Sequence, residues 1–299
     1  MSRQGRTAEH ISASSHCVGE ILAACSDFFE ASGMRDAQRE SRDVVAALLD
    51  VPKFWPTANL TSPAASDLRE HALRAAEKRL AGAPLAYAVG RACFRHLTLD
   101  VDERVLIPRV ETEILVERIL QRCTGDIQTI ADIGTGSGAI ALSLAFERKF
   151  NRVIATDISL DALAVAKSNA ESLGHLLKST VEFRHGALLA PLAGEKLDAI
   201  VSNPPYISFA EAGELPRDVR DWEPLVALVC AQDGLAVTRD LIRGAAELLT
   251  PNGVMAFEVD TRRAGTVAEI IAVDGRYRDV EVLLDLTGRE RFVFARRAS

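Results

Sequence analysis

Residues 129–145 read TIADIGTGSGAIALSLA, and this stretch decides the fold of most of the chain. Its first five residues are mostly apolar or β-branched, which predicts a buried strand, and a segment of helical character follows. Between the two lie Gly134, Gly136 and Gly138, in a turn where glycine lets the backbone pass close to a ligand. A strand, a glycine turn and a helix in this order predict the first unit of an α/β sheet.

The same alternation continues to the C-terminus. Strands are expected at residues 129–133, 152–157, 180–186, 197–203, 253–259, 280–286 and 291–297. Helices are expected at residues 138–149, 159–174, 235–250 and 261–273. Repeated β–α units predict an open, mostly parallel sheet with helices on both faces. The last two strands are joined by the residues TGRE alone, which is too short for a parallel crossover, so one of them is expected to run antiparallel.

The chain before this sheet has a different pattern. Apolar residues recur at three- and four-residue spacing from about residue 19 to 80, which predicts a bundle of helices. Residues 83–108 alternate apolar and polar positions in short pieces, as in a hairpin. We therefore expect an N-terminal helical domain at residues 1–84, a β-hairpin linker at 85–108 and an α/β domain at 109–299. The charge of the helical domain is nearly balanced, so docking on a partner protein suits it better than clamping DNA.

Composition and charge argue against several functional classes. The 299 residues carry a net charge of −7, which does not suit a protein that holds nucleic acid through a broad basic face. The five cysteines are scattered, without a CxxC pair or a Cys/His cluster of metal-ligand spacing, so we expect reduced thiols and no metal. The N-terminus lacks an apolar signal core, and no apolar run approaches membrane-spanning length. These features predict a soluble cytoplasmic protein without direct contact to membranes or nucleic acid.

The glycine turn is a candidate ligand site. On its own it is compatible with a nicotinamide cofactor, with S-adenosylmethionine, or with tight strand–helix packing and no ligand. Asp157 ends the next strand, where a carboxylate can accept hydrogen bonds from both hydroxyls of a ribose. Asp157 could instead cap the following helix, but Ser159 and Asp161 also lie at that helix start and could cap it.

The segment VSNPPYIS, residues 201–208, decides between these ligands. Two consecutive prolines cannot donate to a sheet ladder, so the strand must end here, at the carboxyl edge where such sheets bind ligands. Asn203 offers a side-chain carbonyl and Pro204 a backbone carbonyl. Each can accept one N–H of a planar NH2 group and so turn the nitrogen lone pair toward a methyl donor, while Tyr206 packs against the group. A strand-ending turn is the alternative, but beside the glycine turn the motif favours S-adenosylmethionine over nicotinamide.

Together these motifs resemble one family. GTGSG, ATD and NPPY are similar to motifs of S-adenosylmethionine-dependent amino-methyltransferases. The stretches VLIPRVETEILVE, WEPLVAL, DGL and DLTGRERFV narrow the resemblance to the bacterial protein-(glutamine-N5) methyltransferases that modify class 1 peptide chain release factors. The match runs from about residue 82 to the C-terminus. It implies a seven-stranded Rossmann-like methyltransferase domain and a monomer whose helical domain docks on the release factor. The implied reaction methylates the glutamine of the Gly-Gly-Gln motif and leaves S-adenosylhomocysteine.

The resemblance also assigns site residues. The cofactor would be bound by Gly134, Thr135, Gly136, Ser137, Gly138, Asp157, Ala187, Leu188 and Asn203. The substrate amide would be bound by Asn203, Pro204, Pro205 and Tyr206, and the catalytic residues among these would be Asn203, Pro204 and Tyr206. Arg109 and Glu111 would lie near the roof of the site, although an exposed charge pair at a helix start explains them as well.

The sequence departs from the family pattern at a few positions. Val110 replaces a usual proline, Ala187 replaces an aspartate that commonly meets the adenine amino group, and Leu188 replaces an aromatic residue of some members. Cys230 lies in a segment that is usually rich in glycine, where a buried small residue is expected. Two alternatives stay open: the same chemistry on a ribosomal-protein glutamine, a small molecule or DNA adenine, and a factor-binding module that holds the nucleoside without transferring methyl.

Overall fold

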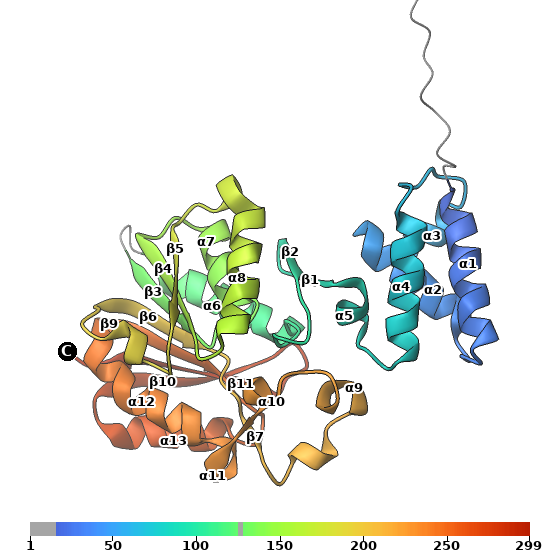
Figure 1. Cartoon of the computed structure of the whole chain (residues 1–299). Helices are drawn as coiled ribbons and strands as arrows, with labels where there is room; N and C mark the ends of the chain where they lie inside the picture. The colour runs from blue at the N-terminus through green and yellow to red at the C-terminus, as the bar shows by residue number, and fades with distance from the viewer. Residues whose placement is uncertain (1–15, 125–127) are drawn as a thin grey trace, which may run out of the picture. The chain divides into compact units, whose positions relative to one another are not determined.

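The computed structural model of the chain describes residues 16–124 and 128–299 (Figure 1). The chain divides into two compact units, which meet in sequence between Val89 and Gly90. Residues 1–15, on which the expected absence of a signal segment rests, lie outside the described residues. Among the residues that are described, no helix is long and apolar enough to cross a membrane.

The first unit is a small bundle of helices. Its elements are α1 (Val18–Ala31), α2 (Ala37–Leu49), α3 (Trp55–Ala58), α4 (Leu68–Leu80) and α5 (Leu85–Val89). In α1, Ile21, Cys25 and Phe29 recur at every fourth residue, so they share one helix face, and all three are fully buried. They pack with Val44 of α2 and Ala72 of α4 in a core that belongs to this unit alone. The expected helical character of the N-terminal part is confirmed.

The segment after α4 differs from the expected linker. Residues 85–89 form α5, in which Tyr87 and Ala88 are buried, whereas the hairpin was expected to begin at residue 85. The Pro84 carbonyl accepts a hydrogen bond from the Ala88 N–H, and Gly90, at a φ of 77°, ends the helix. The hairpin is shorter and consists of β1 (Arg91–Phe94) paired antiparallel with β2 (Leu97–Asp100). It belongs to the second unit.

A seven-stranded sheet forms the centre of the second unit, in the order β10-β11-β9-β6-β3-β4-β5 (Figure 1). Its strands are β3 (Thr129–Ile133), β4 (Arg152–Asp157), β5 (Val181–His185), β6 (Leu197–Ser202), β9 (Leu249–Glu258), β10 (Tyr277–Leu284) and β11 (Glu290–Arg297). Neighbours are parallel from β9 to β5, and β11 runs antiparallel to both β9 and β10. The mostly parallel sheet and the antiparallel member of its closing pair are both confirmed.

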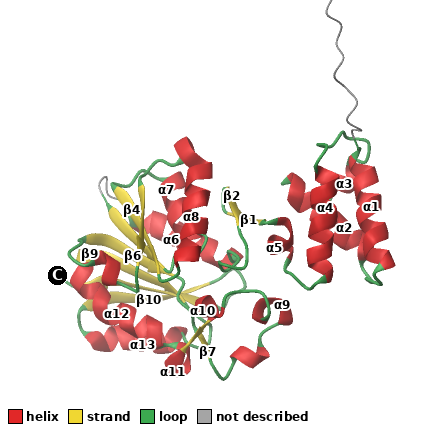
Figure 2. Ribbon diagram, in the orientation of Figure 1, coloured by secondary structure: helices red, strands yellow, loops and turns green. Residues whose placement is uncertain are grey.

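Helices cover both faces of this sheet (Figure 2). One face carries α6 (Val110–Arg122), α7 (Ala139–Glu147) and α8 (Leu160–Leu173), and the other carries α12 (Ala236–Leu248) and α13 (Ala264–Asp274). Ile130 packs in the core on the first face and its neighbour Ala131 in the core on the second, because successive side chains of a strand point to opposite faces. Helix α12 ends two residues earlier than expected, since Leu249 already pairs with Leu197 across β6 and β9.

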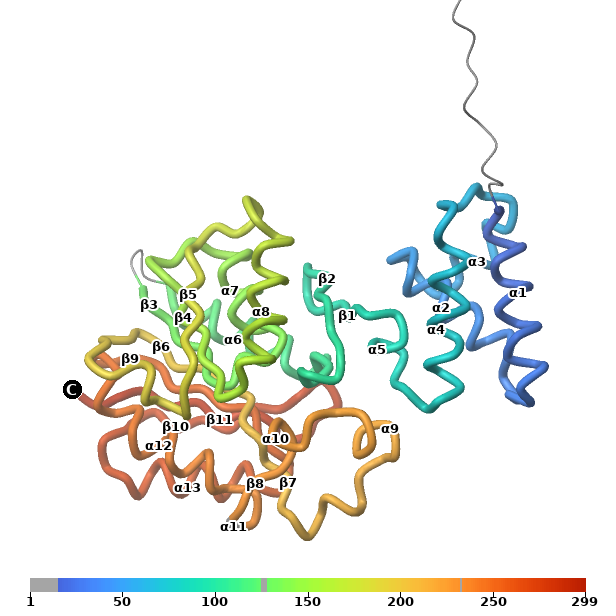
Figure 3. The backbone as a smooth tube through the Cα atoms, in the orientation of Figure 1, coloured from blue at the N-terminus to red at the C-terminus, as the bar shows by residue number. Residues whose placement is uncertain are grey.

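Short elements fill the remainder of the second unit. They are η1 (Gly174–Leu176), η2 (Ala190–Leu192), β7 (Ile207–Ser208), η3 (Ala212–Glu214), α9 (Arg217–Arg220), α10 (Leu225–Leu228), β8 (Val229–Cys230) and α11 (Ala231–Gly234). Strands β7 and β8 pair in parallel and lie side by side in Figure 3. In the main sheet, Ile133 at the end of β3 aligns with Ser202 at the end of β6. The glycine turn and the NPPY segment therefore leave the same edge of the sheet, as the sequence predicted.

Candidate active site

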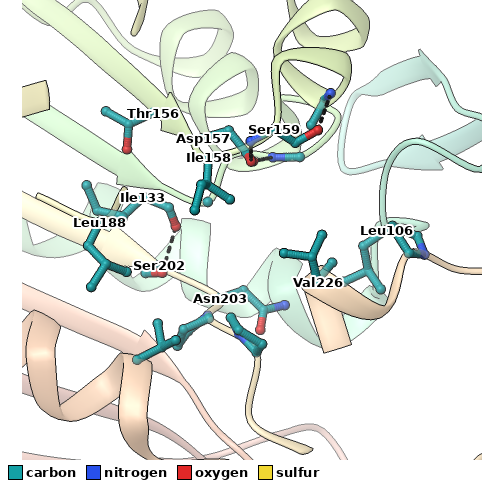
Figure 4. A pocket seen from close by; sticks show the side chains of 18 of the residues that line it. Leu106, Ile133, Thr156, Asp157, Ile158, Ser159, Leu188, Ser202, Asn203 and Val226 are labelled. Atoms are coloured by element: carbon teal, nitrogen blue, oxygen red, sulfur yellow. Dashed lines mark hydrogen bonds between the residues drawn. The ribbon is translucent and has the colours of Figure 1, made fainter. Parts of the chain in front are cut away.

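A cavity of about 260 Å³ lies at the carboxyl ends of β3, β4 and β6 (Figure 4). The chain order reverses between β3 and β6, and open α/β sheets bind ligands at such a point. The site residues expected from the sequence that line this cavity are Gly134, Gly136, Asp157, Ala187, Leu188, Asn203, Pro204 and Pro205. The lining does not include Thr135, Ser137, Gly138 or Tyr206.

The glycine turn presents bare backbone to the cavity. Gly134 and Gly136 have φ values of 73° and 55°, and a Cβ built on either would meet no atom within 4 Å. These two glycines are therefore required by backbone conformation, and open space lies in front of them. Gly138 shares the positive φ, at 85°, and in addition its Cβ would lie 2.8 Å from the Leu142 side chain. The turn thus combines an open face toward the cavity with tight packing on α7.

Asp132, in strand β3, holds this turn by hydrogen bonds. Its Oδ2 accepts hydrogen bonds from the Thr135 hydroxyl at 2.7 Å and from the Ala141 N–H at 3.1 Å. The carboxyl group is fully buried, and this desolvation raises the pKa of Asp132 to about 7. The side chains of Thr135 and Ser137 are also buried. Neither residue lines the cavity, and the Thr135 hydroxyl contributes to the turn through its hydrogen bond to Asp132.

Asp157 connects the end of β4 to the glycine turn. Its Oδ2 accepts a hydrogen bond from the Gly136 N–H and its Oδ1 one from the Ser159 N–H, each at 2.9 Å. Ser159 caps α8, because its hydroxyl oxygen accepts from the Ala162 N–H. The capping role considered for Asp157 thus belongs to Ser159. Each Asp157 oxygen keeps a further lone pair for a ligand in the cavity.

The wall next to Asp157 is apolar. Ile158 and Leu188 line it in Figure 4, and 57% of the Ile158 residue surface is exposed although the residue is large and hydrophobic. Ala187 brings no polar side chain to this wall. Leu188 has a φ of 49°, a left-handed conformation that is uncommon for leucine. A flat ligand here would meet hydrocarbon and backbone groups.

Asn203 lies in the wall of a second cavity as well. That cavity has a volume of about 140 Å³, and Arg109 and Tyr206 are among the residues that line it. Asn203, Leu106 and Ala227 are common to both cavities. The Asn203 Nδ2 donates a hydrogen bond to the Thr112 hydroxyl at 3.2 Å, so the carboxamide is held by its nitrogen. Asn203 therefore stands where the two cavities adjoin.

The rest of NPPY is held by specific contacts. The Cys230 thiol, which is buried, donates to the Pro205 carbonyl at 3.1 Å. A Cβ built on Gly234 would lie 2.2 Å from the Tyr206 carbonyl oxygen, so only glycine allows this approach. In the part of the chain that the structure describes, the Pro204 carbonyl accepts no hydrogen bond. Burial raises the pKa of Tyr206 to about 12, which keeps its phenol neutral.

Arg109, at the start of α6, lines the second cavity. Its Nη2 donates to both carboxylate oxygens of Glu223, at 2.8 and 3.0 Å. Glu223 is buried, and this desolvation raises the pKa of its carboxyl although Arg109 lowers it. The expected position of Arg109 near the site agrees with the cavity lining, whereas Glu111 lines neither cavity.

Comparison with known proteins identifies the family. The model of the methyltransferase small domain family matches residues 103–214. The release factor glutamine methyltransferase of Moorella thermoacetica is 48% identical over 225 residues, which cover 75% of this chain and 78% of that protein. The protein of the same name from Bacillus cereus is 35% identical over 284 residues, covering 93% of this chain and 98% of its own. The chain belongs to the release factor glutamine methyltransferase family. The resemblance found in the sequence is confirmed.

A solved structure shares the fold of this member of the release factor glutamine methyltransferase family. The catalytic domain of hMettl16, solved in complex with the MAT2A 3′UTR hairpin 6, superimposes with a TM-score of 0.53 at 16% identity. The match covers 77% of this chain and 81% of the other. At this level of identity it shows a shared fold alone.

Two polar residues next to the candidate active site were not predicted from the sequence. Thr112 holds the Asn203 amide, and Glu258 accepts the Thr112 hydroxyl hydrogen bond. A signal for Glu258 was present, because a charged residue ends the apolar run VMAF. Among the described residues, no cluster of three or more His, Cys, Asp or Glu side chains could hold a metal ion.

Proposed function

We propose that this chain transfers the methyl group of S-adenosylmethionine to the side-chain amide nitrogen (N5) of the glutamine in the Gly-Gly-Gln motif of class 1 peptide chain release factors. The names of its relatives support this reaction and this target. The observation that carries the proposal is the position of Asn203, in the wall of two adjoining cavities. The larger cavity suits the methyl donor, and the smaller one suits the substrate side chain.

The larger cavity fits the donor by the chemistry of its lining. Gly134 and Gly136 leave backbone exposed where the methionine and ribose would pass, and Asp157 has lone pairs for the ribose hydroxyls. Ala187 and Leu188 would pack against adenine, so its recognition would rest on apolar and backbone contacts. When bound, the cofactor supplies a methyl group activated on a sulfonium sulfur, and S-adenosylhomocysteine is the product.

Asn203 and Pro204 would orient the substrate. The Asn203 Oδ1 and the Pro204 carbonyl each accept one N–H of the glutamine amide, which leaves the nitrogen lone pair facing the larger cavity. An amide nitrogen is a weak nucleophile, so most of the rate comes from this alignment and from the fixed dipoles of the two acceptors. Tyr206, which lines the smaller cavity, packs beside the amide. No side chain is needed as a base, because the proton of the methylated amide leaves to water.

The first unit would contribute docking on the release factor. This role, the monomeric state, the cytoplasmic location and the absence of a nucleic acid partner are predictions from the sequence. Pro205 belongs to the same substrate-binding segment, and its carbonyl is already occupied by the Cys230 thiol. We therefore expect Pro205 to contribute stiffness and to leave hydrogen bonding of the substrate to Asn203 and Pro204.

Mass spectrometry of purified proteins tests the proposed function. The full chain and S-adenosylmethionine carrying a labelled methyl group are incubated in separate reactions with an unmethylated class 1 release factor, with an unmethylated ribosomal protein and with adenine-containing DNA. We expect one methyl group on the Gly-Gly-Gln glutamine of the release factor. If another substrate is methylated and the release factor is not, the proposed target is wrong and that other substrate takes its place. Cofactor binding without any transfer would favour a non-catalytic module.

Two alanine variants sharpen this test. Asn203→Ala should lose turnover while keeping the affinity for S-adenosylhomocysteine within about threefold, because the larger cavity has many other lining residues. Asn151→Ala is the matched control, since Asn151 is an exposed asparagine outside both cavities. Equal turnover of Asn203→Ala and Asn151→Ala would rule out the role given to Asn203.

A further inference from the structure

Behind Asn203 lies a pair of polar residues that the proposed chemistry does not use. The Asn203 Nδ2 donates to the Thr112 Oγ1 at 3.2 Å, and the Thr112 hydroxyl donates to the Glu258 Oε2 at 2.6 Å. Thr112 is 4% exposed and Glu258 is 1% exposed, so both lie in the protein interior. The three residues form one hydrogen-bonded chain that ends where the two cavities adjoin.

The fold brings these three residues together from separate elements. Strands β6 and β9 pair with Ser202 opposite Phe257, so the next residues, Asn203 and Glu258, lie at neighbouring strand ends. Thr112 comes from the first turn of α6, which packs on β9. The positions are therefore fixed by strand register and helix packing, which hold a site more rigidly than loops do.

The direction of the two hydrogen bonds determines how the Asn203 amide is turned. The Thr112 hydroxyl donates to the Glu258 Oε2, and once Glu258 is ionised its carboxylate can only accept, so the hydroxyl proton points to Glu258. The Thr112 oxygen then has only lone pairs to offer on its other side, and the Asn203 NH2 group is the end of the amide that can meet them. Without this chain the amide could flip by half a turn at little cost. With it, Oδ1 stays directed away from Thr112.

Burying the Glu258 carboxyl group in the protein interior carries a desolvation cost. In the part of the chain that the structure describes, no ion pair to Glu258 lies within 4.0 Å. The charges that act on it come from Arg291, Arg109 and Glu111, and burial raises the pKa of Glu258 to about 7. A buried carboxyl without an ion pair seldom contributes net stability. A task at the site explains its presence better than folding does.

We propose that Thr112 and Glu258 are positioning residues, which hold the Asn203 carboxamide with Oδ1 available to the substrate NH2 group. This inference rests on the proposed function, because it names what orients the group that binds the substrate. It assigns the two residues no contact with substrate or cofactor. Their effect should therefore appear in the methyl-transfer step and leave cofactor binding unchanged.

Steady-state kinetics with three variants tests the inference. Thr112→Val keeps the shape of the side chain and removes the hydroxyl, and we expect kcat to fall about 10- to 100-fold because a small misplacement costs this much. Thr112→Ser keeps the hydroxyl and should stay within about threefold of the unchanged protein. Thr238→Val is the control, since Thr238 is a fully buried threonine whose hydroxyl has no partner among the described residues. Affinity for S-adenosylhomocysteine, measured by calorimetry, should be the same in all three.

The Asn203 side chain can also be observed directly. In protein labelled with ¹⁵N-asparagine, its NH2 signals are identified by their loss in Asn203→Ala. We expect them to move upfield in Thr112→Val and to stay in place in Thr112→Ser. The inference would be overturned if the NH2 signals did not move in Thr112→Val, or if the kcat of Thr112→Val were normal. It would also be overturned if both Thr112 variants lost kcat and cofactor affinity to the same extent. Failure of the unchanged protein to methylate any release factor would overturn the proposed function, and the NH2 signals would still decide the positioning role.

Discussion

The Gly136 N–H donates a hydrogen bond to the Asp157 carboxylate at 2.9 Å, and this bond joins two motifs that the sequence separates by 21 positions. The same carboxylate receives the Ser159 N–H at 2.9 Å. Asp157 thus holds the glycine turn, which lines the larger cavity, besides offering lone pairs to a ligand.

Asp157→Ala should weaken cofactor binding. The substitution removes the proposed acceptor of the ribose hydroxyls and releases the Gly136 N–H, and hydrogen bonds to a charged group contribute about 1.5–3 kcal/mol each. We expect the dissociation constant for S-adenosylhomocysteine to rise about 10- to 100-fold in a calorimetric titration. Asp240→Ala, at an exposed aspartate of α12, is the matched control. Equal affinities of the two variants would remove Asp157 from the cofactor site.

Gly234→Ala should displace the NPPY segment, although Gly234 itself lines neither cavity. Its new Cβ would lie 2.2 Å from the Tyr206 carbonyl oxygen, and the residue has a φ of 81°, which disfavours any L side chain. We expect a loss of more than about 1 kcal/mol of unfolding free energy and a fall in kcat. Gly213→Ala is the control, because a Cβ there meets nothing within 4 Å. Denaturant unfolding and turnover that match the control would show that the close approach does not matter.

Val110→Pro should stabilise the protein. Val110 is the first residue of α6 and is 64% exposed, a position where proline costs no helical hydrogen bond. The preceding Arg109 has a ψ of 142°, which is the conformation that a following proline requires. We expect a gain of about 0.5–1 kcal/mol in unfolding free energy, measured by urea titration, because proline restricts the unfolded chain. Val110→Ala separates this effect from the loss of an exposed apolar side chain. A destabilised proline variant would contradict the helix start described here.

Unfolding should depend on pH through two buried carboxyls. Burial raises the pKa of Asp132 and of Glu258 to about 7. Between about pH 4 and pH 7 the folded chain then binds more protons than the unfolded chain, so the free energy of unfolding falls as the pH rises. Carboxyls with a lowered pKa, such as Glu211 at about 2, are ionised in both states above pH 5 and do not oppose this trend.

Asp132→Asn is the variant that checks this dependence. Asparagine keeps an oxygen that can accept from the Thr135 hydroxyl and the Ala141 N–H, and it removes the titration. We expect the urea midpoint of the unchanged protein to fall from pH 5 to pH 8, and the fall to be smaller in the variant. The same slope in both proteins would mean that Asp132 does not titrate in this range.

The sheet and the meeting of its two motifs were predictable because local patterns determine them. Apolar runs alternate with helical segments, and the neighbouring positions of β3 and β6 follow from the doubly wound order. The end of α12 was predicted wrongly, since the pairing of Leu249 with Leu197 ends the helix and depends on a residue far away in sequence. Helix α5 was missed for a similar reason, because it depends on tertiary packing: Ala88 belongs to the first unit's core and Tyr87 is buried.

The site was predictable only in part. GTGSG and NPPY could be recognised in the sequence, because ordinary packing does not need their residue types. Thr112 gives no such signal, and Glu258 gives only that of a charged residue after the apolar run VMAF. Their contact joins positions 146 residues apart, so no local pattern predicts it. The side chains of Thr135 and Ser137 belong to the predicted motif but are buried, and the Thr135 hydroxyl is held there by its hydrogen bond to the Asp132 carboxylate.

A crystal structure of the protein with S-adenosylhomocysteine and a peptide carrying the Gly-Gly-Gln sequence tests the central claim most directly. We expect the glutamine amide nitrogen at about 3 Å from both the Asn203 Oδ1 and the Pro204 carbonyl oxygen, with its free face toward the cofactor sulfur. A glutamine side chain bound elsewhere, or an Asn203 that presents Nδ2 to the amide, would contradict the account.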